Sequence, residues 1–573
     1  MCYNANAIYA GVSLTQRSSV ARGAAIMVVS VILAKVLGVL YVVPLTRLIG
    51  PIGLGIYQNG YSLYTILLTL GAAGFPTAMG KLISERLARR QYAEVDQIFR
   101  VTLKTIGLLA VIFALITWFG APIYSYLVAV KDAAGSEAAL VWSIRALAPA
   151  VLIVPFLSAL RGYMQGFQRM DWSGYSQTIE QIFRVVAMIV GAAIAIHWFR
   201  AGTTSSIAAG AAAATFGAFV GAVAGLIFLS FVTVRLRITL AAQRSRQRSK
   251  HSDKEIRRML LAVALPICAG ALVVPISNLA DSLTVQNFLM IFAHESLTQA
   301  ERSFGILSRQ AFTLIQLPLA FSLAIGSSIL PAIASASAVG NQREVERTVM
   351  NTFRSMFFIT LPLASAFFIL AKPIDILLFN STSGAPIIES ISFMGIFSGL
   401  EQISTFMLQG IGKLYRPVRN LFLGVFVKVI FNLILIPHLH IMGAALATSI
   451  GYLFSSTLNV LAVKKYGRVQ FSVFGLAIPM LGPTLLALGL MWLLKTGMER
   501  SLGLTMQAHH ILEAGIITFV VLFAASAFYL VTSIRFRVVS SQELSRLPAV
   551  GGRLARLANK IRPVNPGQST HIE

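Results

Sequence analysis

Apolar stretches of about twenty residues recur along nearly the whole chain, and each is long enough for a helix to cross a hydrocarbon core about 30 Å thick. Segments such as residues 106–119 and 476–494 are apolar on almost every face, whereas barrel strands would alternate apolar and polar residues over about ten positions. A mean hydropathy of +0.76 with only 12% charged residues exceeds what a water-soluble domain can bury. The sequence therefore predicts an all-α polytopic membrane protein.

The apolar pattern predicts about fourteen transmembrane helices. Their expected ranges are 23–46, 56–80, 101–128, 139–160, 174–198, 206–234, 259–292, 305–335, 353–371, 386–411, 420–437, 442–463, 472–494 and 510–533. The seventh contains Pro266, Pro275 and a polar run, so it is expected to be a broken helix of the kind that lines transporter sites.

Basic residues are concentrated in the segments on one side of the predicted membrane topology. Most of the 47 lysines and arginines fall in the N-terminal tail, the even-numbered loops and the C-terminal tail, with the richest segments at 81–100, 235–258 and 535–562. The positive-inside rule therefore predicts a multi-pass protein of the cell membrane with both termini in the cytoplasm. Orientation and attraction to anionic membrane lipids account for the net charge of +26, so no nucleic-acid partner is expected.

An internal repeat divides the chain. Arg184 follows Gln165 by 19 residues, and Lys428 follows Gln409 by the same 19. The copies lie six helices apart, which keeps both in the same orientation, as in transporters built from two related halves. The expected parts are a cytoplasmic tail (1–22), an N-lobe of six helices (23–234) and a basic cytoplasmic linker (235–258). A C-lobe of six helices (259–463), two further helices (472–533) and a basic cytoplasmic tail (534–573) follow.

Ionised residues inside the spans are the candidate site residues, because each costs about 2.5–3.5 kcal/mol to place near the bilayer centre. The basic candidates for substrate binding are Lys35, Arg184, Lys428, Arg309 and Arg145. Lys35 is either an anion contact facing a cavity or the partner of a carboxylate on a neighbouring helix. Arg184 either pairs within its helix with Glu180, four residues earlier, or enters a cleft opposite Lys428 and holds a phosphate.

Acidic and helix-breaking residues supply the remaining candidates. Asp281, Glu180 and Glu401 are candidates for coupling to an ion or a proton, although Asp281 could instead lie close to the outer surface. Candidate hinge positions are Gly74, Pro76, Pro275 and Pro318, which fit bendable helices. Close helix packing explains the glycines equally well.

Motifs for covalent chemistry are missing from the sequence. It has no nucleotide-binding glycine loop, no nucleophile elbow and no cluster with metal-ligand spacing, and Cys2 and Cys268 are too few and too far apart to indicate a disulfide or a metal site. We expect a transporter rather than an enzyme, with no catalytic residue, metal or cofactor. Energy would come from the membrane potential, a Na⁺ or H⁺ gradient, or removal of the substrate on the far side.

Several segments resemble a known family. Residues 34–38 and 46–57, with Gly74-Phe75-Pro76, are similar to the first helices of polysaccharide-type flippases in the multidrug/oligosaccharidyl-lipid/polysaccharide (MOP) superfamily. Residues 160–166 and 176–184 are similar to the signature of the stage V sporulation protein B group and of lipid II flippases of the MurJ type. The resemblance covers nearly the whole chain.

The resemblance implies two six-helix lobes that form a V around a cationic cavity, a groove for the undecaprenyl tail on the last two helices, and rocking between inward-facing and outward-facing states. Lys35 stands where the family usually has an arginine, so the bidentate fork is lost while the charge is kept. Tyr41 stands at a second basic position, where the charge is lost as well. The implied contact with the lipid diphosphate is therefore altered in this chain.

The leading function is flipping of lipid II, or a related undecaprenyl-diphosphate sugar, to the outer leaflet for peptidoglycan synthesis in growth or sporulation. The alternatives are export of a teichoic or capsular repeat unit, a drug/cation antiporter, which would favour acidic cavity residues, and a non-transporting scaffold for cell-wall synthases. Expected partners are thus the undecaprenyl-linked lipid, membrane lipids and cell-wall synthases.

Overall fold

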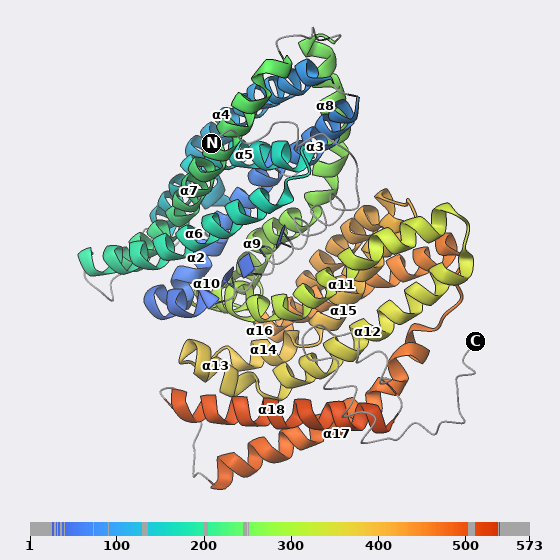
Figure 1. Cartoon of the computed structure of the whole chain (residues 1–573). Helices are drawn as coiled ribbons and strands as arrows, with labels where there is room; N and C mark the ends of the chain where they lie inside the picture. The colour runs from blue at the N-terminus through green and yellow to red at the C-terminus, as the bar shows by residue number, and fades with distance from the viewer. Residues whose placement is uncertain are drawn as a thin grey trace, which may run out of the picture. The chain divides into compact units, whose positions relative to one another are not determined.

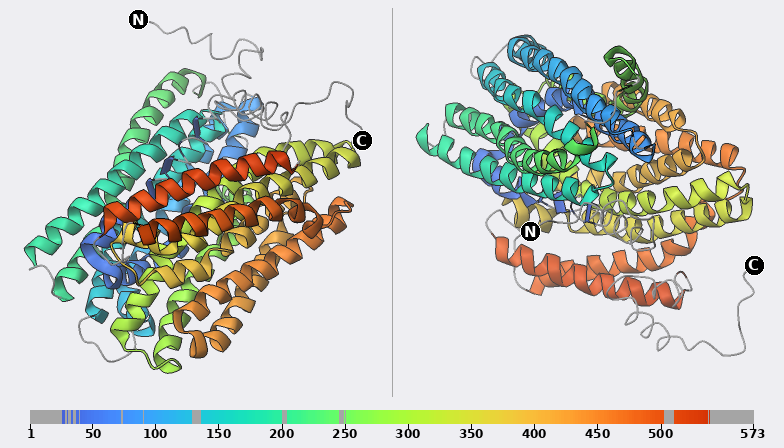
Figure 2. Two further views of the ribbon diagram at one scale, coloured as in Figure 1. Left: turned by 90° about the horizontal axis from the view of Figure 1, so that it is seen from below. Right: turned by 45° about the horizontal axis from the view of Figure 1, so that its top comes forward.

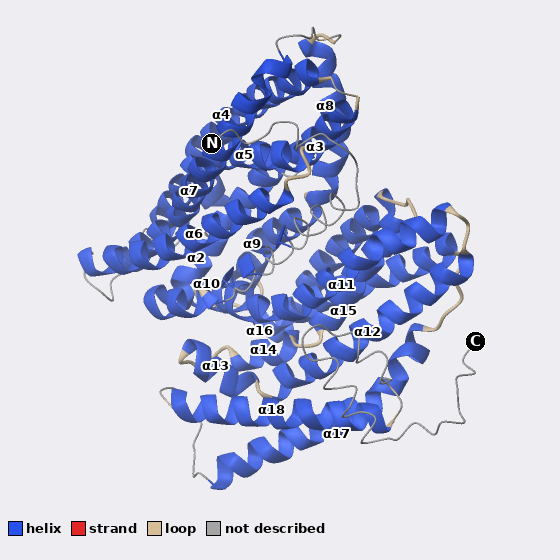
Figure 3. Ribbon diagram, in the orientation of Figure 1, coloured by secondary structure: helices blue, strands red, loops and turns tan. Residues whose placement is uncertain are grey.

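Helices form all the regular secondary structure among the described residues (Figure 3). The computed structural model describes residues 40–72, 74–89, 91–128, 136–199, 204–244, 251–501 and 510–536, with scattered positions between 26 and 38 and the single residues 249 and 538. Contacts between Cα atoms divide the chain into two compact units. The first unit comprises residues 1–313 and 429–444, and the second comprises 314–428 and 445–573.

The first unit is a bundle with α5 at its centre, because α5 packs against α2, α3, α4 and α7 (Figure 1). Its helices are α2 (Val42–Ala72), α3 (Gly74–Ala88), α4 (Tyr92–Val128), α5 (Ser136–Gly166), α6 (Met170–Trp198), α7 (Thr204–Arg244), α8 (Asp253–Ala271), α9 (Val273–Ile291), α10 (Leu297–Gly305) and the π-helix η2 (Ile306–Ala311). Phe75, Met79, Phe99 and Tyr163 lie in a buried core that joins α3, α4, α5 and α8. The bundle thus holds its helices by apolar packing around α5.

The second unit is built around α12, which packs against α15 and α17. Its helices are α11 (Phe312–Ala338), α12 (Gln342–Ile369), α13 (Ala371–Phe379), α14 (Ala385–Ile391), α15 (Met394–Gly410), α16 (Tyr415–Gly467), α17 (Val473–Ser501) and α18 (Ile511–Arg535). The last two helices, α17 and α18, lie side by side (Figure 2). The middle of α16, residues 429–444, groups with the first unit.

Eleven helices among the described residues are long and apolar enough to cross a membrane, so the predicted all-α polytopic membrane fold is confirmed. The count of fourteen stays a prediction, because the first expected helix, 23–46, lies largely outside the described residues. Helix α16 has 53 residues and a break at His440, where φ is +52°, and it contains both the expected helices 420–437 and 442–463. The expected break in the seventh helix occurs at Leu272, between α8 and α9.

The predicted lobes, 23–234 and 259–463, are not the same segments as the two units. Helices α8, α9, α10 and η2 follow the basic linker in sequence but group with α2 to α7. Helix α8 packs on α3 and α4, and α9 packs on α2. The division into six-helix lobes therefore stays a prediction.

The candidate hinge residues lie at close helix contacts. A Cβ on Gly74 would overlap the carbonyl oxygen of Ala264 in α8, and one on Gly162 of α5 would lie 2.5 Å from the Cα of Pro76. Pro275 sits in the first turn of α9, where a proline removes no needed helical hydrogen bond. In the second unit, the ring of Pro318 lies against Gly395 of α15. Close packing accounts for Gly74 in this structure, and the hinge roles stay predictions.

Replacing Gly74 by alanine should destabilise the protein by about 1–3 kcal/mol, the usual cost of inserting atoms into a packed contact. The added Cβ would meet the α8 backbone and would lie 2.6 Å from the Cys268 Sγ. Thermal unfolding of the purified protein in detergent measures the effect. Gly120→Ala is the matched control, because a Cβ at Gly120 in α4 has no neighbour within 4 Å. Equal unfolding temperatures for the two variants would contradict the prediction.

Asp375 is expected to make the stability of the second unit depend on pH. It lies in α13, outside the candidate membrane spans, and its side chain is fully buried with Oδ2 accepting the backbone N–H of Gly384 at 2.8 Å. Burial raises the pKa of this carboxyl to about 7, whereas an unfolded chain ionises aspartate near pH ~3.9. Between these two pH values the folded protein therefore binds more protons than the unfolded chain does. Its stability falls as the pH rises through that interval.

We expect the unfolding temperature to decrease as the pH rises from about 4 to about 7. Asp375→Asn should remove the part of this decrease that comes from ionisation of the Asp375 carboxyl. The amide oxygen of asparagine can still accept the Gly384 N–H, so the backbone contact survives the substitution. Thermal scans at stepped pH measure the difference between the two proteins. If the difference in unfolding temperature between wild type and Asp375→Asn stays constant from about pH 4 to about pH 7, the Asp375 carboxyl is not the source of the pH dependence.

Candidate functional site

A ladder of three tyrosines on α2 forms the framework of the candidate site in the first unit. Tyr57, Tyr61 and Tyr64 are spaced by four and three residues, which places them on one face of the helix. The Tyr57 and Tyr61 rings stack with centroids 5.6 Å apart, and those of Tyr61 and Tyr64 are 5.2 Å apart. Tyr57 and Tyr64 are almost fully buried. The ladder thus presents aromatic faces and hydroxyl groups inside the bundle.

Arg309 projects from the π-helix η2 onto this ladder. Its Cζ lies 4.5 Å from the ring centroid of Tyr57 and 4.9 Å from that of Tyr61, and its Nη1 donates to the Tyr41 hydroxyl at 3.3 Å. Single π-helical turns often occur at functional sites. The arginine is therefore held by ring faces and one hydroxyl, from residues far away in the sequence.

The charge of Arg309 has no carboxylate partner within ion-pair distance in the part of the chain that the structure describes. Its Nε and Nη2 atoms are buried and make no hydrogen bond to a described residue. Tyrosine faces compensate a desolvated cation by about 2 kcal/mol, which is less than a buried ion normally costs. Arg309 is therefore a cation whose charge no acidic group among the described residues balances.

Two glycines bring this arginine to the ladder. A Cβ on Gly305, at the end of α10, would overlap the carbonyl oxygen of Pro51, and a Cβ on Gly55 would lie 2.6 Å from the carbonyl oxygen of Glu301. Because neither glycine has a side chain, α10 lies directly on α2 (Figure 1). The following π-helix η2 packs on α2 as well. The close approach sets the register of Arg309 against Tyr57 and Tyr61.

A second charged group joins α5 and α6. The Oε1 of Glu180 accepts from Nη2 of Arg184, one turn along α6, and its Oε2 accepts from Nη2 of Arg161 in α5 at 2.7 Å. Arg161 also donates to the Ser176 hydroxyl at 3.1 and 3.0 Å. The side chains are 10% exposed for Glu180 and 17% for each arginine. One carboxylate thus binds two buried guanidinium groups.

The two groups share the tyrosine ladder. Tyr57, Tyr61 and Tyr64 all lie in the neighbourhood of Arg184, and the rings of Tyr57 and Tyr61 also contact Arg309. These two groups together contain three guanidinium groups and one carboxylate. Such a surplus of buried positive charge favours an anion with several oxygen acceptors, such as a phosphate or a diphosphate.

Polar side chains continue from the ladder toward α9. The Asn59 amide donates to Gln286 Oε1 at 3.0 Å, and the Ser282 hydroxyl donates to that of Ser62 at 2.9 Å. Asp281 lies beside Ser282 in the middle of α9 and is 7% exposed. This candidate for ion coupling is therefore buried in the first unit, near the polar contacts between α2 and α9.

The remaining predicted site residues lie elsewhere. Lys428 in α16 and Glu401 in α15 are buried in the second unit, and Glu401 Oε1 accepts from the Thr405 hydroxyl at 2.9 Å. Arg145 lies near the start of α5 between two tryptophans. Lys35 lies outside the described residues. The expected approach of Arg184 and Lys428 from opposite lobes therefore stays a prediction, whereas the pairing of Arg184 with Glu180 is confirmed.

Sequence reasoning missed Arg161 and the tyrosine ladder. The expected fourth helix ended at residue 160, but α5 continues to Gly166, so Arg161 was placed in a loop rather than inside the bundle. The tyrosine spacing on one face of a single helix was a usable signal. The partnership of Arg309 with Tyr41 had no local signal, because 268 residues separate them.

Comparison with known proteins supports the same architecture. The model of a family described as polysaccharide biosynthesis protein matches residues 20–337. The chain is 26% identical over 465 residues to the lipid II flippase MurJ of Bacillus subtilis, covering 80% of this chain and 84% of that protein. It is 24% identical over 540 residues to stage V sporulation protein B of the same organism, covering 93% and 99%.

Solved structures show the same fold at lower identity. The lipid II flippase MurJ in an inward closed conformation superposes with a TM-score of 0.63 at 14% identity, covering 89% of this chain and 98% of that one. An inward-facing multidrug resistance MATE family transporter of the MOP superfamily gives a TM-score of 0.60 at 17% identity, covering 76% and 94%. The helical architecture is thus that of MurJ and MATE proteins.

Proposed function

The chain belongs to the polysaccharide biosynthesis protein family, a membrane-flippase family of the MOP superfamily, and from this membership we propose that it flips lipid II across the cell membrane. Its similarity to MurJ and to stage V sporulation protein B supports the coarser conclusion that it is a flippase for a lipid-linked precursor. These relatives are consistent with a transporter rather than an enzyme. In the proposed orientation both termini face the cytoplasm, and the substrate moves from the inner to the outer leaflet by alternating access.

The observation that carries the proposal is Arg309, which has no carboxylate partner among the described residues. Its free Nε and Nη2 atoms form one edge of the guanidinium fork, which matches two oxygens of a phosphate. The diphosphate of an undecaprenyl-linked substrate would supply the missing negative charge. Arg184 and Arg161, which share one carboxylate, add to the positive potential along the tyrosine ladder. A drug/cation antiporter would instead need a surplus of acidic groups here.

The other predicted residues have proposed roles. We assign Lys35 and Lys428 as further contacts to the diphosphate during the transport cycle. Asp281 and Glu401, both buried, are the proposed groups for coupling to Na⁺ or H⁺, with the membrane potential as the alternative energy source. Helices α17 and α18 are the proposed groove for the undecaprenyl tail, as the family resemblance implies.

Export of a teichoic or capsular repeat unit is the second candidate function, because the same diphosphate linkage would bind the same arginines. Accessibility of lipid II to an externally added probe separates the two. Cells that lack their own flippase and express this chain should regain accessible lipid II. If well-expressed protein gives no recovery, another undecaprenyl-linked polymer becomes the substrate. A scaffold for cell-wall synthases would be favoured if single replacements of Lys35, Arg184 and Lys428 all left complementation intact.

A further inference from the structure

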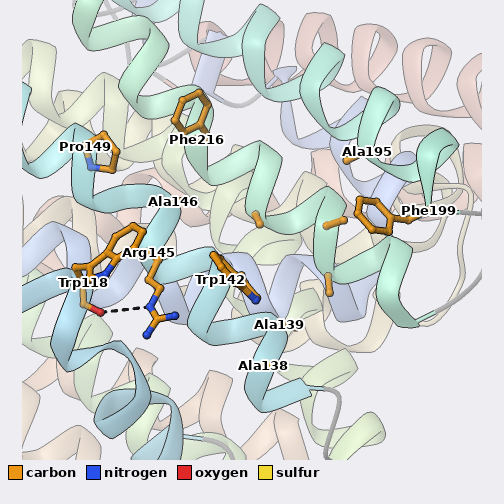
Figure 4. A pocket seen from close by; sticks show the side chains of 13 residues that line it. Trp118, Ala138, Ala139, Trp142, Arg145, Ala146, Pro149, Ala195, Phe199 and Phe216 are labelled. Atoms are coloured by element: carbon orange, nitrogen blue, oxygen red, sulfur yellow. Dashed lines mark hydrogen bonds between the residues drawn. The ribbon is translucent and has the colours of Figure 1, made fainter.

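An apolar groove of about 700 Å³ opens between α4, α5, α6 and α7 of the first unit (Figure 4). It lies where α5 and α7 begin and where α6 ends, which is the end of the bundle opposite the turn that joins α5 to α6. Its principal lining residues are Trp118, Trp142, Arg145, Ala209, Ala212 and Phe216. The groove is distinct from the tyrosine ladder and has no part in the proposed transport site.

Small side chains create the space. Alanines from α5 and α7 line much of the groove, while Trp118 from α4 and Phe216 from α7 supply larger apolar surfaces. A volume of this size is in the range of pockets that hold small apolar molecules. Because the groove is made by helices that are long and apolar enough to cross a membrane, hydrocarbon chains are the apolar molecules expected to reach it.

Among the described residues that line the groove, Arg145 is the one that carries a charge. Its Cζ lies 5.4 Å from the ring centroid of Trp118 and 5.6 Å from that of Trp142, and its Nε donates to the Trp118 carbonyl oxygen at 3.4 Å. No carboxylate among the described residues lies within ion-pair distance of it. Its two terminal nitrogens therefore remain available to an anion inside an otherwise apolar groove.

The surrounding tryptophans place this end of the bundle at a membrane interface. Trp142 and Trp198 lie near the ends of α5 and α6 on this side, Trp118 lies about three turns before the end of α4, and all three side chains are exposed. Tryptophan is enriched at the level of the lipid headgroups, and an arginine there can reach the phosphates. A ligand with a phosphate at one end and a hydrocarbon chain at the other fits both parts of the groove.

We propose that this groove binds an anionic glycerophospholipid of the surrounding bilayer. The phosphate accepts hydrogen bonds from Arg145, and one acyl chain lies along the alanines of α5 and α7. In the orientation proposed above, the lipid comes from the outer leaflet. The site would hold a bilayer lipid whichever lipid-linked precursor the protein transports. The proposal is therefore independent of the proposed transport function.

Tryptophan fluorescence tests the proposal in the full-length protein. The three tryptophans outside the groove are replaced by phenylalanine, so that Trp118 and Trp142 report on its occupant. The protein is reconstituted in phosphatidylcholine bilayers, and quenching by phosphatidylglycerol with brominated acyl chains is compared with quenching by brominated phosphatidylcholine. We expect about a fivefold preference for phosphatidylglycerol, the effect of one basic residue near an anionic lipid.

Three variants define the outcome. Arg145→Gln should abolish the preference, and Ala212→Phe should reduce quenching by both lipids because it fills the groove. Arg100→Gln, which removes an exposed cation at the other end of α4, should keep the preference. Thermal unfolding confirms that each variant is folded.

The proposal is overturned if Arg145→Gln retains the preference or if Ala212→Phe leaves quenching unchanged. Displacement by glycerol phosphate without acyl chains would indicate a simple anion site and would also overturn it. The proposal is also overturned if undecaprenyl diphosphate displaces the brominated lipid at concentrations at which phosphatidylglycerol does not. The groove would then bind the transported lipid rather than a bilayer phospholipid.

Discussion

Replacing Arg309 by methionine should reduce lipid II translocation at least about tenfold. Hydrogen bonds to a charged group contribute about 1.5–3 kcal/mol, and each 1.36 kcal/mol is a tenfold change in rate or binding. Methionine keeps an apolar side chain of similar length against the rings of Tyr57 and Tyr61 but removes the cation that lies over both rings. Accessibility of lipid II to an external probe, at matched protein level in the membrane, measures the loss.

Two control variants separate charge from packing. Arg309→Lys keeps the positive charge without the bidentate fork, so it should retain an intermediate rate. Arg302→Met removes an exposed arginine of α10 and should leave the rate unchanged. A wild-type rate in Arg309→Met would exclude this residue as the anion contact.

Stability should not follow activity in this variant. A buried charge without a counter-charge costs desolvation free energy, and its replacement by an apolar side chain of similar volume is often neutral or stabilising. We therefore expect Arg309→Met to unfold at the same temperature as the wild type or at a higher one. A lower unfolding temperature would indicate that Arg309 serves the packing of η2 on α2 rather than a substrate.

Replacing Glu180 by alanine should destabilise the protein by about 3–5 kcal/mol, the cost of breaking a buried ion pair from one side. The substitution leaves Arg184 and Arg161 facing each other without the carboxylate that now accepts from both. Thermal or denaturant-induced unfolding of the purified protein measures the loss. The effect should exceed that of most single substitutions because two charges, not one, lose their partner.

Asp171→Ala is the matched control on the same helix. Asp171 also pairs with an arginine, Arg169, at 3.3 Å, but that arginine is 51% exposed, and exposed pairs contribute about 1 kcal/mol or less. Adding Arg161→Met and Arg184→Met to Glu180→Ala should restore much of the stability, since the buried charges are then gone. If Glu180→Ala unfolds like Asp171→Ala, the buried group does not stabilise the bundle.

Much of the site could be anticipated from local sequence, but only in separate pieces. The spacing of Glu180 and Arg184 predicted their pairing, because residues four apart share a helix face. Arg309 was a candidate because a charge inside an apolar span is costly. Neither pattern indicated that Arg184 shares its carboxylate with Arg161, or that Arg309 has no carboxylate partner among the described residues.

The sequence by itself determined that this chain is a helical membrane protein. A bilayer leaves the backbone no hydrogen-bond partner outside its own segment, so apolar length alone specifies a spanning helix. Only the tertiary structure decided which buried charges are neutralised. That outcome depends on contacts between distant segments, such as Arg309 with Tyr41 and Arg161 with Glu180, and on the glycines that let α10 approach α2. Periodicity within one helix carries no information about which helix will lie beside it.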